Sequence, residues 1–172
     1  MPTYVGLLRG VNVGGKNNLP MADLRALCAS LGFRDVTTFI QSGNVVFKSE
    51  ATPRPSHLED AIKQHFDITT TVVLRTSNEL EKILLANPFS AEEKAHLHVA
   101  FVALDHMHGL PTLDGERYVP ERFVIIGSEI YLYLPNGVAR SKLPIYLDRQ
   151  LRTRVTLRNW NTVEKLADLA RT

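Results

Sequence analysis

The feature that most constrains the fold is the order of strand-like and helix-like hydrophobic patterns in the first 76 residues. An apolar run at residues 3–9 precedes a helical stripe, a pair of β-branched runs around Ser42 and Gly43, a second helical stripe and a β-branched run at residues 70–75. The stripes show the three- and four-residue spacing of a helix face, with Leu24, Leu27 and Leu31 in the first and Leu58, Ile62 and Phe66 in the second. Strand, helix, hairpin, helix, strand is the order of a ferredoxin-like βαββαβ unit, so residues 1–76 are predicted to form one such half.

The same order restarts after a connecting segment. Residues 77–95 are predicted to link the halves through a helix that stops before Pro88, because proline disfavours helical backbone in the preceding residue. Residues 96–172 then show an apolar run, a hairpin around Gly127, a helix after Pro144, a short strand and a C-terminal helix. Residues 106–120 have no periodicity and are predicted as a loop or one broken helical turn. The predicted fold class is α+β, with two ferredoxin-like halves and a C-terminal helix.

Three helix starts are predicted from capping boxes, in which a side chain at the first position and an acid three residues later satisfy free backbone N–H groups. The segments are Ser56 to Glu59, Thr76 to Glu79 and Asn161 to Glu164. An earlier helix is predicted to begin at Pro20, since proline suits the first turn. The loops before two of the helices also resemble each other, as GGKNNLPMADL and GVARSKLPIYL.

Composition is that of an ordinary globular protein. The 172 residues are 44% hydrophobic and 22% charged, which is enough for a buried core. A formal net charge of +2 means that any basic surface depends on local clustering. Cys28 lies on the apolar face of the first helix and is predicted to be core filler. No leader pattern or bilayer-length apolar stretch is present, so we expect a cytoplasmic protein with no membrane partner.

Residues 9–18, RGVNVGGKNN, match the first seven positions of the P-loop pattern. Gly10, Gly15 and Lys16 fit, but Asn17 stands where the pattern needs a hydroxyl. A P-loop also requires a helix that begins within the loop, whereas Pro20 places the helix start beyond it. The P-loop interpretation is therefore disfavoured, together with a Walker B interpretation of the apolar run ending at Asp105.

Two further interpretations are disfavoured. An RNA-recognition motif needs exposed aromatic residues on its third strand, and SGNVVFKS offers only Phe47. His96 and His98 lie two apart on a predicted strand, and His106 and His108 follow in a loop, which is a pattern that zinc accepts. No carboxylate has a ligand-like spacing with them, so they are interpreted as surface histidines and no metal site is predicted.

Four motifs occur in order along the chain: LLRGVNVGGKNNLPMADLRAL, FIQSGNVVF, ARSKLP and LRNWNTVEKLADL. With these motifs the chain resembles the family of proteins called domain of unknown function 1697 (DUF1697) over nearly all of residues 4–169. The resemblance implies a bacterial-type soluble protein without an assigned reaction. Cofactors, oligomeric state and any catalysed reaction therefore stay unassigned.

The motifs and the topology together give a candidate ligand-binding site. In a βαββαβ unit the first strand ends beside the hairpin tip, which places residues 9–17 next to 41–44. In the second half, the third and fourth strands end at a shared edge of the sheet, which places residues 140–142 near 158–160. Glycine N–H groups, amides and cations of this kind suit phosphate or carboxylate, and Trp160 offers a ring for a planar ligand. The candidates are Arg9, Asn12, Gly14, Gly15, Lys16, Asn17, Gln41, Ser42, Gly43, Asn44, Arg140, Ser141, Lys142, Arg158, Asn159 and Trp160.

The alternative is that these residues hold the fold: asparagines bond turn backbone, Arg158 pairs with a carboxylate and Trp160 fills the core. The leading functional hypothesis is binding of an anionic, phosphorylated small molecule, a nucleotide or a nucleic-acid backbone. Its alternatives are a protein-interaction or structural module without a small-molecule ligand, and an enzyme acting on a phosphorylated substrate.

Overall fold

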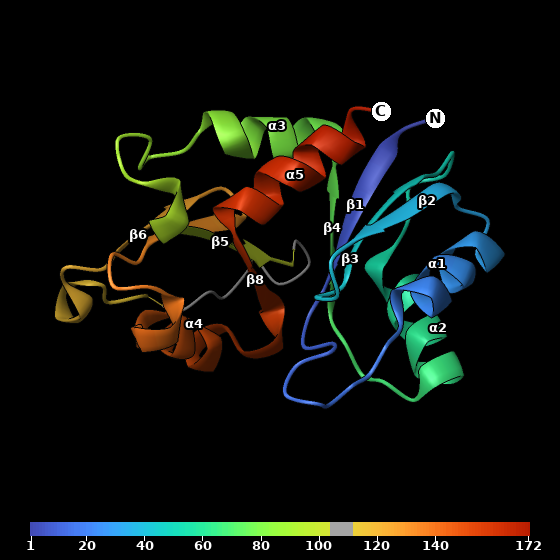
Figure 1. Cartoon of the computed structure of the whole chain (residues 1–172), viewed down its shortest axis with the longest axis horizontal. Helices are drawn as coiled ribbons and strands as arrows, with labels where there is room; N and C mark the ends of the chain where they lie inside the picture. The colour runs from blue at the N-terminus through green and yellow to red at the C-terminus, as the bar shows by residue number, and fades with distance from the viewer. Residues whose placement is uncertain (104–111) are drawn as a thin grey trace. The chain divides into compact units, whose positions relative to one another are not determined.

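Two four-stranded antiparallel sheets organise the chain in a computed structural model that describes residues 1–103 and 112–172 (Figure 1). The first sheet contains β1 (Thr3–Leu8), β2 (Arg34–Phe39), β3 (Asn44–Lys48) and β4 (Val72–Thr76), in the order β2-β3-β1-β4. Helix α1 (Met21–Ser30) lies between β1 and β2 in sequence, and α2 (Pro55–Phe66) lies between β3 and β4. The predicted α+β fold with ferredoxin-like βαββαβ halves is therefore confirmed for this half.

One face of this sheet packs against α1 and α2. Alternate strand residues point to the same face, and Tyr4, Leu8 and Phe47 on that face share a buried core with Leu24 of α1 and Leu58 of α2. Cys28 belongs to the same core and is fully buried, as predicted. Burial raises the pKa of the Cys28 thiol to about 12, so this group stays protonated and unreactive in the folded chain.

The second sheet repeats the arrangement. It contains β5 (Leu97–Val102), β6 (Arg122–Ile126), β7 (Glu129–Tyr133) and β8 (Val155–Asn159), in the order β6-β7-β5-β8. Helix α4 (Leu143–Leu151) packs on one face through Leu143, Leu147 and Leu151. Short 3-10 turns lie at Lys94–His96, Val138–Arg140 and Arg152–Arg154.

The second half has no counterpart of α1 within the part of it that the structure describes. Residues 112–121 contain one 3-10 turn, Glu116–Tyr118, where the first half has a ten-residue helix. This agrees with the broken turn predicted there, as far as the described residues extend. Asp105, His106 and His108 lie outside the described residues.

One further helix follows the last strand of each sheet: α3 (Ser77–Leu85) after β4, and α5 (Trp160–Ala170) after β8. These strand–helix pairs share a sequence pattern, VVLRTSNELEK at 72–82 and VTLRNWNTVEK at 155–165. Arg75 and Arg158 occupy the same position of this repeat, and both are at least nine-tenths buried. This strand–helix repeat is a second sequence similarity between the two halves, beside the similarity of the loops GGKNNLPMADL and GVARSKLPIYL.

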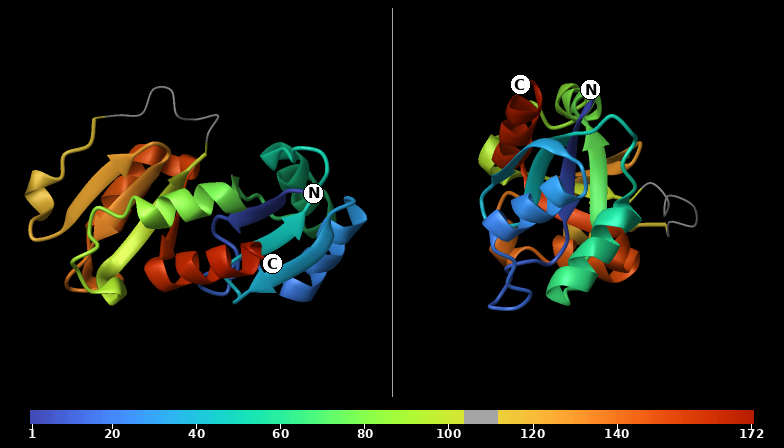
Figure 2. Two further views of the ribbon diagram at one scale, coloured as in Figure 1. Left: turned by 90° about the horizontal axis from the view of Figure 1, so that it is seen from above. Right: turned by 90° about the vertical axis from the view of Figure 1, so that its right-hand side faces the viewer.

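The chain divides into two compact units, which the two views of Figure 2 show from above and from one side. The first unit combines Met1–Glu81 with Leu166–Thr172, and the second is Lys82–Lys165. The C-terminal turns of α5 therefore belong to the same unit as the first strand. Among the helices of the described residues, none combines the length and the apolar character needed to cross a membrane.

One of the three predicted capping boxes is confirmed. The Thr76 N–H donates to Glu79 Oε2 at 2.6 Å, and the Glu79 N–H donates to Thr76 Oγ1 at 3.1 Å. The box at Ser56 was wrong: α2 begins at Pro55, and Glu59 accepts the distant Val72 N–H instead. A proline at the first helical position lacks the N–H that a cap would satisfy, so this start needs less capping.

The predicted starts of two other helices differ from the observed starts by one residue: α5 begins one residue before the predicted start, and α1 begins one residue after it. Helix α5 begins at Trp160, and Asn159 Oδ1 accepts the Thr162 N–H at 2.9 Å in place of the predicted cap at Asn161. Helix α1 begins at Met21, with Pro20 just before it. Local sequence propensity predicts the position of a helix start to within one or two residues, whereas the hydrogen bonds of the folded chain determine the first helical residue.

Candidate functional site

The end of β1 and the tip of the β2–β3 hairpin meet in the first unit, as the topology predicts. The Leu8 N–H donates to Gly43 O at 2.8 Å. Gly43 has φ +86°, and a Cβ there would lie 2.6 Å from Val11 Cγ2 and 2.8 Å from Leu8 Cβ. Because only glycine fits this conformation and this contact, Gly43 fixes how closely the loop after β1 approaches the hairpin.

Asn12 braces the loop after β1 from inside. Its Nδ2 donates to Leu19 O at 2.9 Å and to Gln41 O at 2.6 Å, and its Oδ1 accepts the Leu19 N–H at 2.8 Å. Asn17 adds a second brace, because its Nδ2 donates to Gly10 O at 3.0 Å. Both asparagines have positive φ, near +54°, a conformation that asparagine tolerates better than most residues. Their amides are thus committed to holding the loop.

Gly14 and Gly15 form the tip of a small hairpin within this loop. The Lys16 N–H donates to Val13 O at 3.0 Å, and the two glycines have φ of +58° and +73°. Positive φ at both central residues defines a type I′ turn. The Gly-Gly-Lys sequence is therefore the turn of a β-hairpin, which agrees with the rejection of the P-loop interpretation.

Several groups of this loop and of the adjoining hairpin tip have no bonding partner among the residues that the structure describes. They are the Lys16 ammonium, the N–H groups of Gly14 and Gly15, and the Gln41 side-chain amide. All four residues are exposed. Arg9 is half-buried, and the hairpin amide of Asn44 is fully buried, where Nδ2 donates to Phe39 O and Ser42 Oγ. We call Gly14, Gly15, Lys16 and Gln41 the loop surface.

Of the three candidate residues before α4, one has side-chain hydrogen bonds and the other two have exposed, unpaired side chains in the described structure. Ser141 is buried, donates to Glu121 Oε2 at 2.6 Å and accepts the Leu143 N–H at 3.1 Å, so it anchors the start of the helix. Arg140 and Lys142 are exposed, and neither side chain has an ion pair within residues 1–103 and 112–172.

Two of the three candidates at the end of β8, Arg158 and Trp160, are buried, whereas Asn159 is exposed. Arg158 is 8% exposed, and its guanidinium donates to Thr156 Oγ1 and Leu157 O, both at 2.9 Å. Burial lowers the pKa of Arg158 to about 10, so the group is still charged at neutral pH. Trp160 is 3% exposed, and its Nε1 donates to Glu164 Oε1 at 3.0 Å. The C-terminal ends of β7 and β8 lie at the same edge of the sheet, as predicted. Ser141 and Arg158, however, hydrogen-bond to different residues.

His98 was wrongly interpreted as a surface residue. It is 7% exposed, and its Nδ1 has no hydrogen-bond partner in the described structure. Burial lowers the pKa of His98, which favours the neutral ring. Within the described residues no three histidine, cysteine or acidic side chains are grouped as metal ligands.

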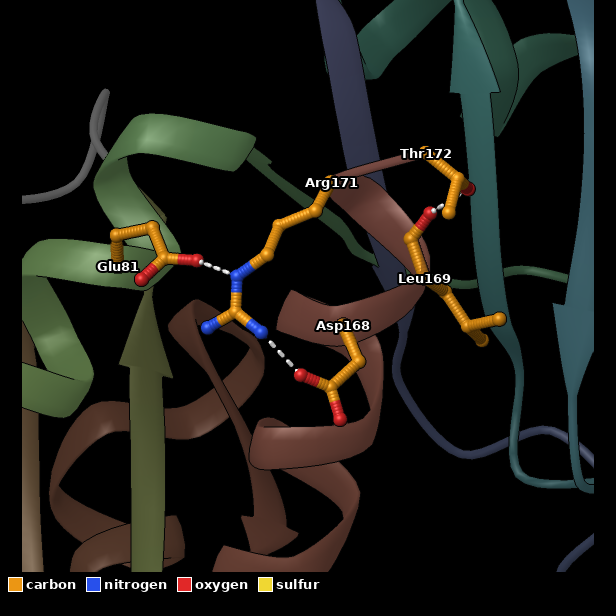
Figure 3. A network of polar contacts seen from close by, with 5 residues as sticks. All are labelled: Glu81, Asp168, Leu169, Arg171 and Thr172. Carbon is orange, nitrogen blue, oxygen red and sulfur yellow. Dashed lines mark hydrogen bonds and ion pairs between the residues drawn. The ribbon is translucent and has the colours of Figure 1, made fainter.

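A polar network near the chain end gave no clear signal in the sequence. Arg171 hydrogen-bonds and ion-pairs with both Glu81 and Asp168, and the Thr172 hydroxyl donates to Leu169 O (Figure 3). A hollow of about 520 Å³ in the first unit is lined by Arg171 and Glu81 together with the start of α3. Two carboxylates already neutralise Arg171. Only the three-residue spacing of Asp168 and Arg171 is visible in the sequence, since Glu81 lies 90 positions away.

The fold and the loops place the chain in the class of α+β proteins with two ferredoxin-like halves. Each half has a polar, glycine-containing loop before a helix, α1 in the first and α4 in the second. The family model described as protein of unknown function (DUF1697) matches residues 1–131, and the chain belongs to this family. The match confirms the resemblance seen in the motifs.

Comparison with solved structures supports the fold. The conserved bacterial protein SP0830 from Streptococcus pneumoniae has a similar structure, with a TM-score of 0.74 and 23% sequence identity over 98% of each chain. No curated protein matches the chain. The family is described as one of unknown function, so neither comparison assigns a reaction to this chain.

Proposed function

We propose that the chain binds a phosphate-bearing ligand on the loop surface of the first unit. The observation that carries the proposal is that the Lys16 ammonium and the Gly14 and Gly15 N–H groups have no partner in the described structure, on a loop that is braced from within. Backbone N–H groups beside a fixed cation form the kind of surface that accepts phosphate oxygens. The Gln41 amide adds a further donor.

The bracing matters because a flexible loop loses conformational entropy when it binds. Asn12 joins the loop to the hairpin backbone at Gln41 and to the chain before α1 at Leu19. These bonds hold the loop to two other segments of the chain, so the donors need little rearrangement to bind a ligand. The asparagines thus support binding through the loop shape rather than through direct contact.

The exposure of the loop surface favours a phosphate presented by a larger molecule. Enclosed small-molecule sites bury most of their ligand, whereas the four residues of the loop surface are all exposed. Nucleic-acid backbone and nucleotides are therefore the first ligands to test, and phosphorylated metabolites the next. The exposed Arg140 and Lys142 of the second unit are a second place where such a ligand is expected to bind.

The test compares Lys16→Ala with Lys16→Arg and with Lys165→Ala, an exposed lysine on α5. Fluorescence anisotropy with labelled oligonucleotides at several salt concentrations, and thermal-shift assays with nucleotides, measure binding. Loss of one phosphate contact is expected to weaken nucleic-acid binding several-fold and to reduce the salt slope by about 1. Lys165→Ala is expected to match the unmodified chain, and Lys16→Arg to retain most binding.

Two results would count against the proposal. One is the absence of binding to every anion in the panel at low salt. The other is binding that Lys16→Ala and Lys165→Ala weaken equally, since this indicates a diffuse charge effect.

A further inference from the structure

The two sheets have corresponding edge strands, β2 in the first and β6 in the second, and these differ in how they are protected. β2 carries Arg34 and Asp35, and its pairing with β3 shifts register between Arg34 and Thr37. Asp35 has φ +50° within this irregular stretch. Charges and bulges are common ways of preventing an edge strand from pairing with another chain.

β6 has no such register shift, and its one charged residue is Arg122 at its start. Its five residues pair with β7 without a register shift, from Arg122 opposite Tyr133 to Ile126 opposite Glu129. The four residues after Arg122 are Phe-Val-Ile-Ile, and Ile125 and Ile126 are 46% and 37% exposed. Among the strands that the structure describes, β7 is the one neighbour of β6.

Within the described residues the second half has no counterpart of α1, which explains part of this exposure. In the first half, α1 packs beside β2, and Arg25 of α1 donates to Thr38 Oγ1. In the second half, the described residues between β5 and β6 supply one 3-10 turn. Phe123 reaches the core under α4, whereas Ile125, two residues along the same face, stays half-exposed.

We propose that β6 pairs in antiparallel orientation with β6 of a second copy of this chain, so that two four-stranded sheets join at their edges. An edge strand presents unpaired N–H and C=O groups at alternate residues, and strand addition satisfies them. A twofold axis makes such an interface self-complementary.

The sequence of β6 suits pairing with itself. With the axis at Val124, Phe123 lies opposite Ile125 of the second copy and Val124 lies opposite its own counterpart. The two Arg122 residues fall at opposite ends of the pair, about 14 Å apart at 3.4 Å per residue, so like charges do not meet. Arg122 is already held by Glu92 at 2.7 Å and over the Tyr133 ring, which keeps its charge away from the new strand.

The experiment measures the mass in solution of the chain, 19.3 kDa as a monomer, by analytical ultracentrifugation over a range of concentrations. Ile125→Lys introduces a charge in the middle of the proposed contact. Ile145→Lys is the matched control, because Ile145 is 55% exposed and belongs to α4 and not to β6. The unmodified chain and Ile145→Lys are expected to dimerise equally, and Ile125→Lys to raise the dissociation constant at least about tenfold.

A cross-linking variant tests the register independently of the mass. Val124→Cys is expected to form a disulfide-linked dimer on mild oxidation, while Cys28 is buried and does not compete. Thr37→Cys on β2 is the matched control and is expected to stay monomeric under the same treatment. Melting curves by circular dichroism verify that each variant is folded.

Three outcomes would overturn the proposal: a chain that is monomeric at roughly 0.5 mM, equal dimerisation of Ile125→Lys and the unmodified chain, or a dimer in which Val124→Cys does not cross-link. Dimerisation is also expected to persist at high salt, since backbone pairing and apolar contact are not screened. Failure here leaves the phosphate-binding proposal untouched, because that test uses different residues and a salt-dependent signal.

Discussion

Replacing Asn12 is expected to loosen the loop surface by removing three hydrogen bonds at once. The Asn12 amide bonds the backbone of Leu19 and the carbonyl of Gln41, which lies 29 positions from Asn12 in the sequence. No other side chain reaches both groups with donor and acceptor in these positions in the described structure. Asn12→Ala, Asn12→Gly and Asn12→Asp separate the contributions of the bonds and of the backbone.

The expected magnitudes follow from the bonds and from φ. Three bonds at the low end of the usual 0.5–1.5 kcal/mol each, because the site is only half-buried, give a loss of about 1.5 kcal/mol for Asn12→Gly. Asn12→Ala is expected to lose about 1 kcal/mol more, since alanine resists the positive φ of this position. Asn12→Asp keeps the acceptor for the Leu19 N–H but turns a carboxylate oxygen toward the Leu19 and Gln41 carbonyl oxygens, so its loss is expected to exceed that of Asn12→Gly.

Urea denaturation followed by circular dichroism measures these differences, and hydrogen exchange at the Leu19 amide reports the local bond directly. Asn18→Ala is the matched control, because Asn18 is exposed and has no hydrogen bond in the described structure. The reasoning fails if Asn12→Ala changes the free energy of unfolding by less than about 0.5 kcal/mol, which is the ordinary range for surface substitutions. Unchanged exchange at Leu19 in Asn12→Ala would refute it as well.

Three further predictions concern the rest of the chain. Thr76→Ala removes one bond of the capping box at α3 and is expected to cost about 1 kcal/mol in the free energy of unfolding, with Ser77→Ala as the control; an unchanged urea midpoint would argue against the box. Burial holds the pKa of His98 below 6.5, so the unfolded chain binds the proton before the folded chain does. The free energy of unfolding is therefore expected to fall as the pH drops through 6.5, and to fall less in His98→Gln. Parallel pH profiles of the two chains would contradict this. Trp160, the single tryptophan, is buried, so its fluorescence is expected to have the short emission wavelength of an apolar site and to resist iodide quenching, whereas strong quenching would place the ring at the surface.

Hydrophobic periodicity was sufficient to predict the fold class because strands and helices of this chain differ clearly in their spacing. The repeated order also located the broken turn before β6. Helix starts were harder to predict, since they depend on partners that are distant in sequence. Glu59 fits a capping box by spacing, yet its carboxylate accepts the Val72 N–H from β4.

The candidate site shows the same division. Topology predicted that the loop after β1 meets the β2–β3 hairpin, and the bonds of Asn12 and Leu8 join them. Sequence spacing does not show which amides are already bonded, because this depends on φ and on distant carbonyl groups. His98 was misplaced for a related reason: histidine is common at exposed strand starts, and only the packing of the second sheet shows that this one is buried.

The assignment of Leu166–Thr172 to the first unit has a practical consequence for dissecting the protein. A single cut between residues 81 and 82 removes from the first unit the C-terminal segment that completes it. Separate expression of the halves therefore requires Leu166–Thr172 to be supplied to residues 1–81, for example through a designed connection or as a peptide in trans. Recovery of a folded first half only when that peptide is present would show that the two ends of the chain fold as one piece.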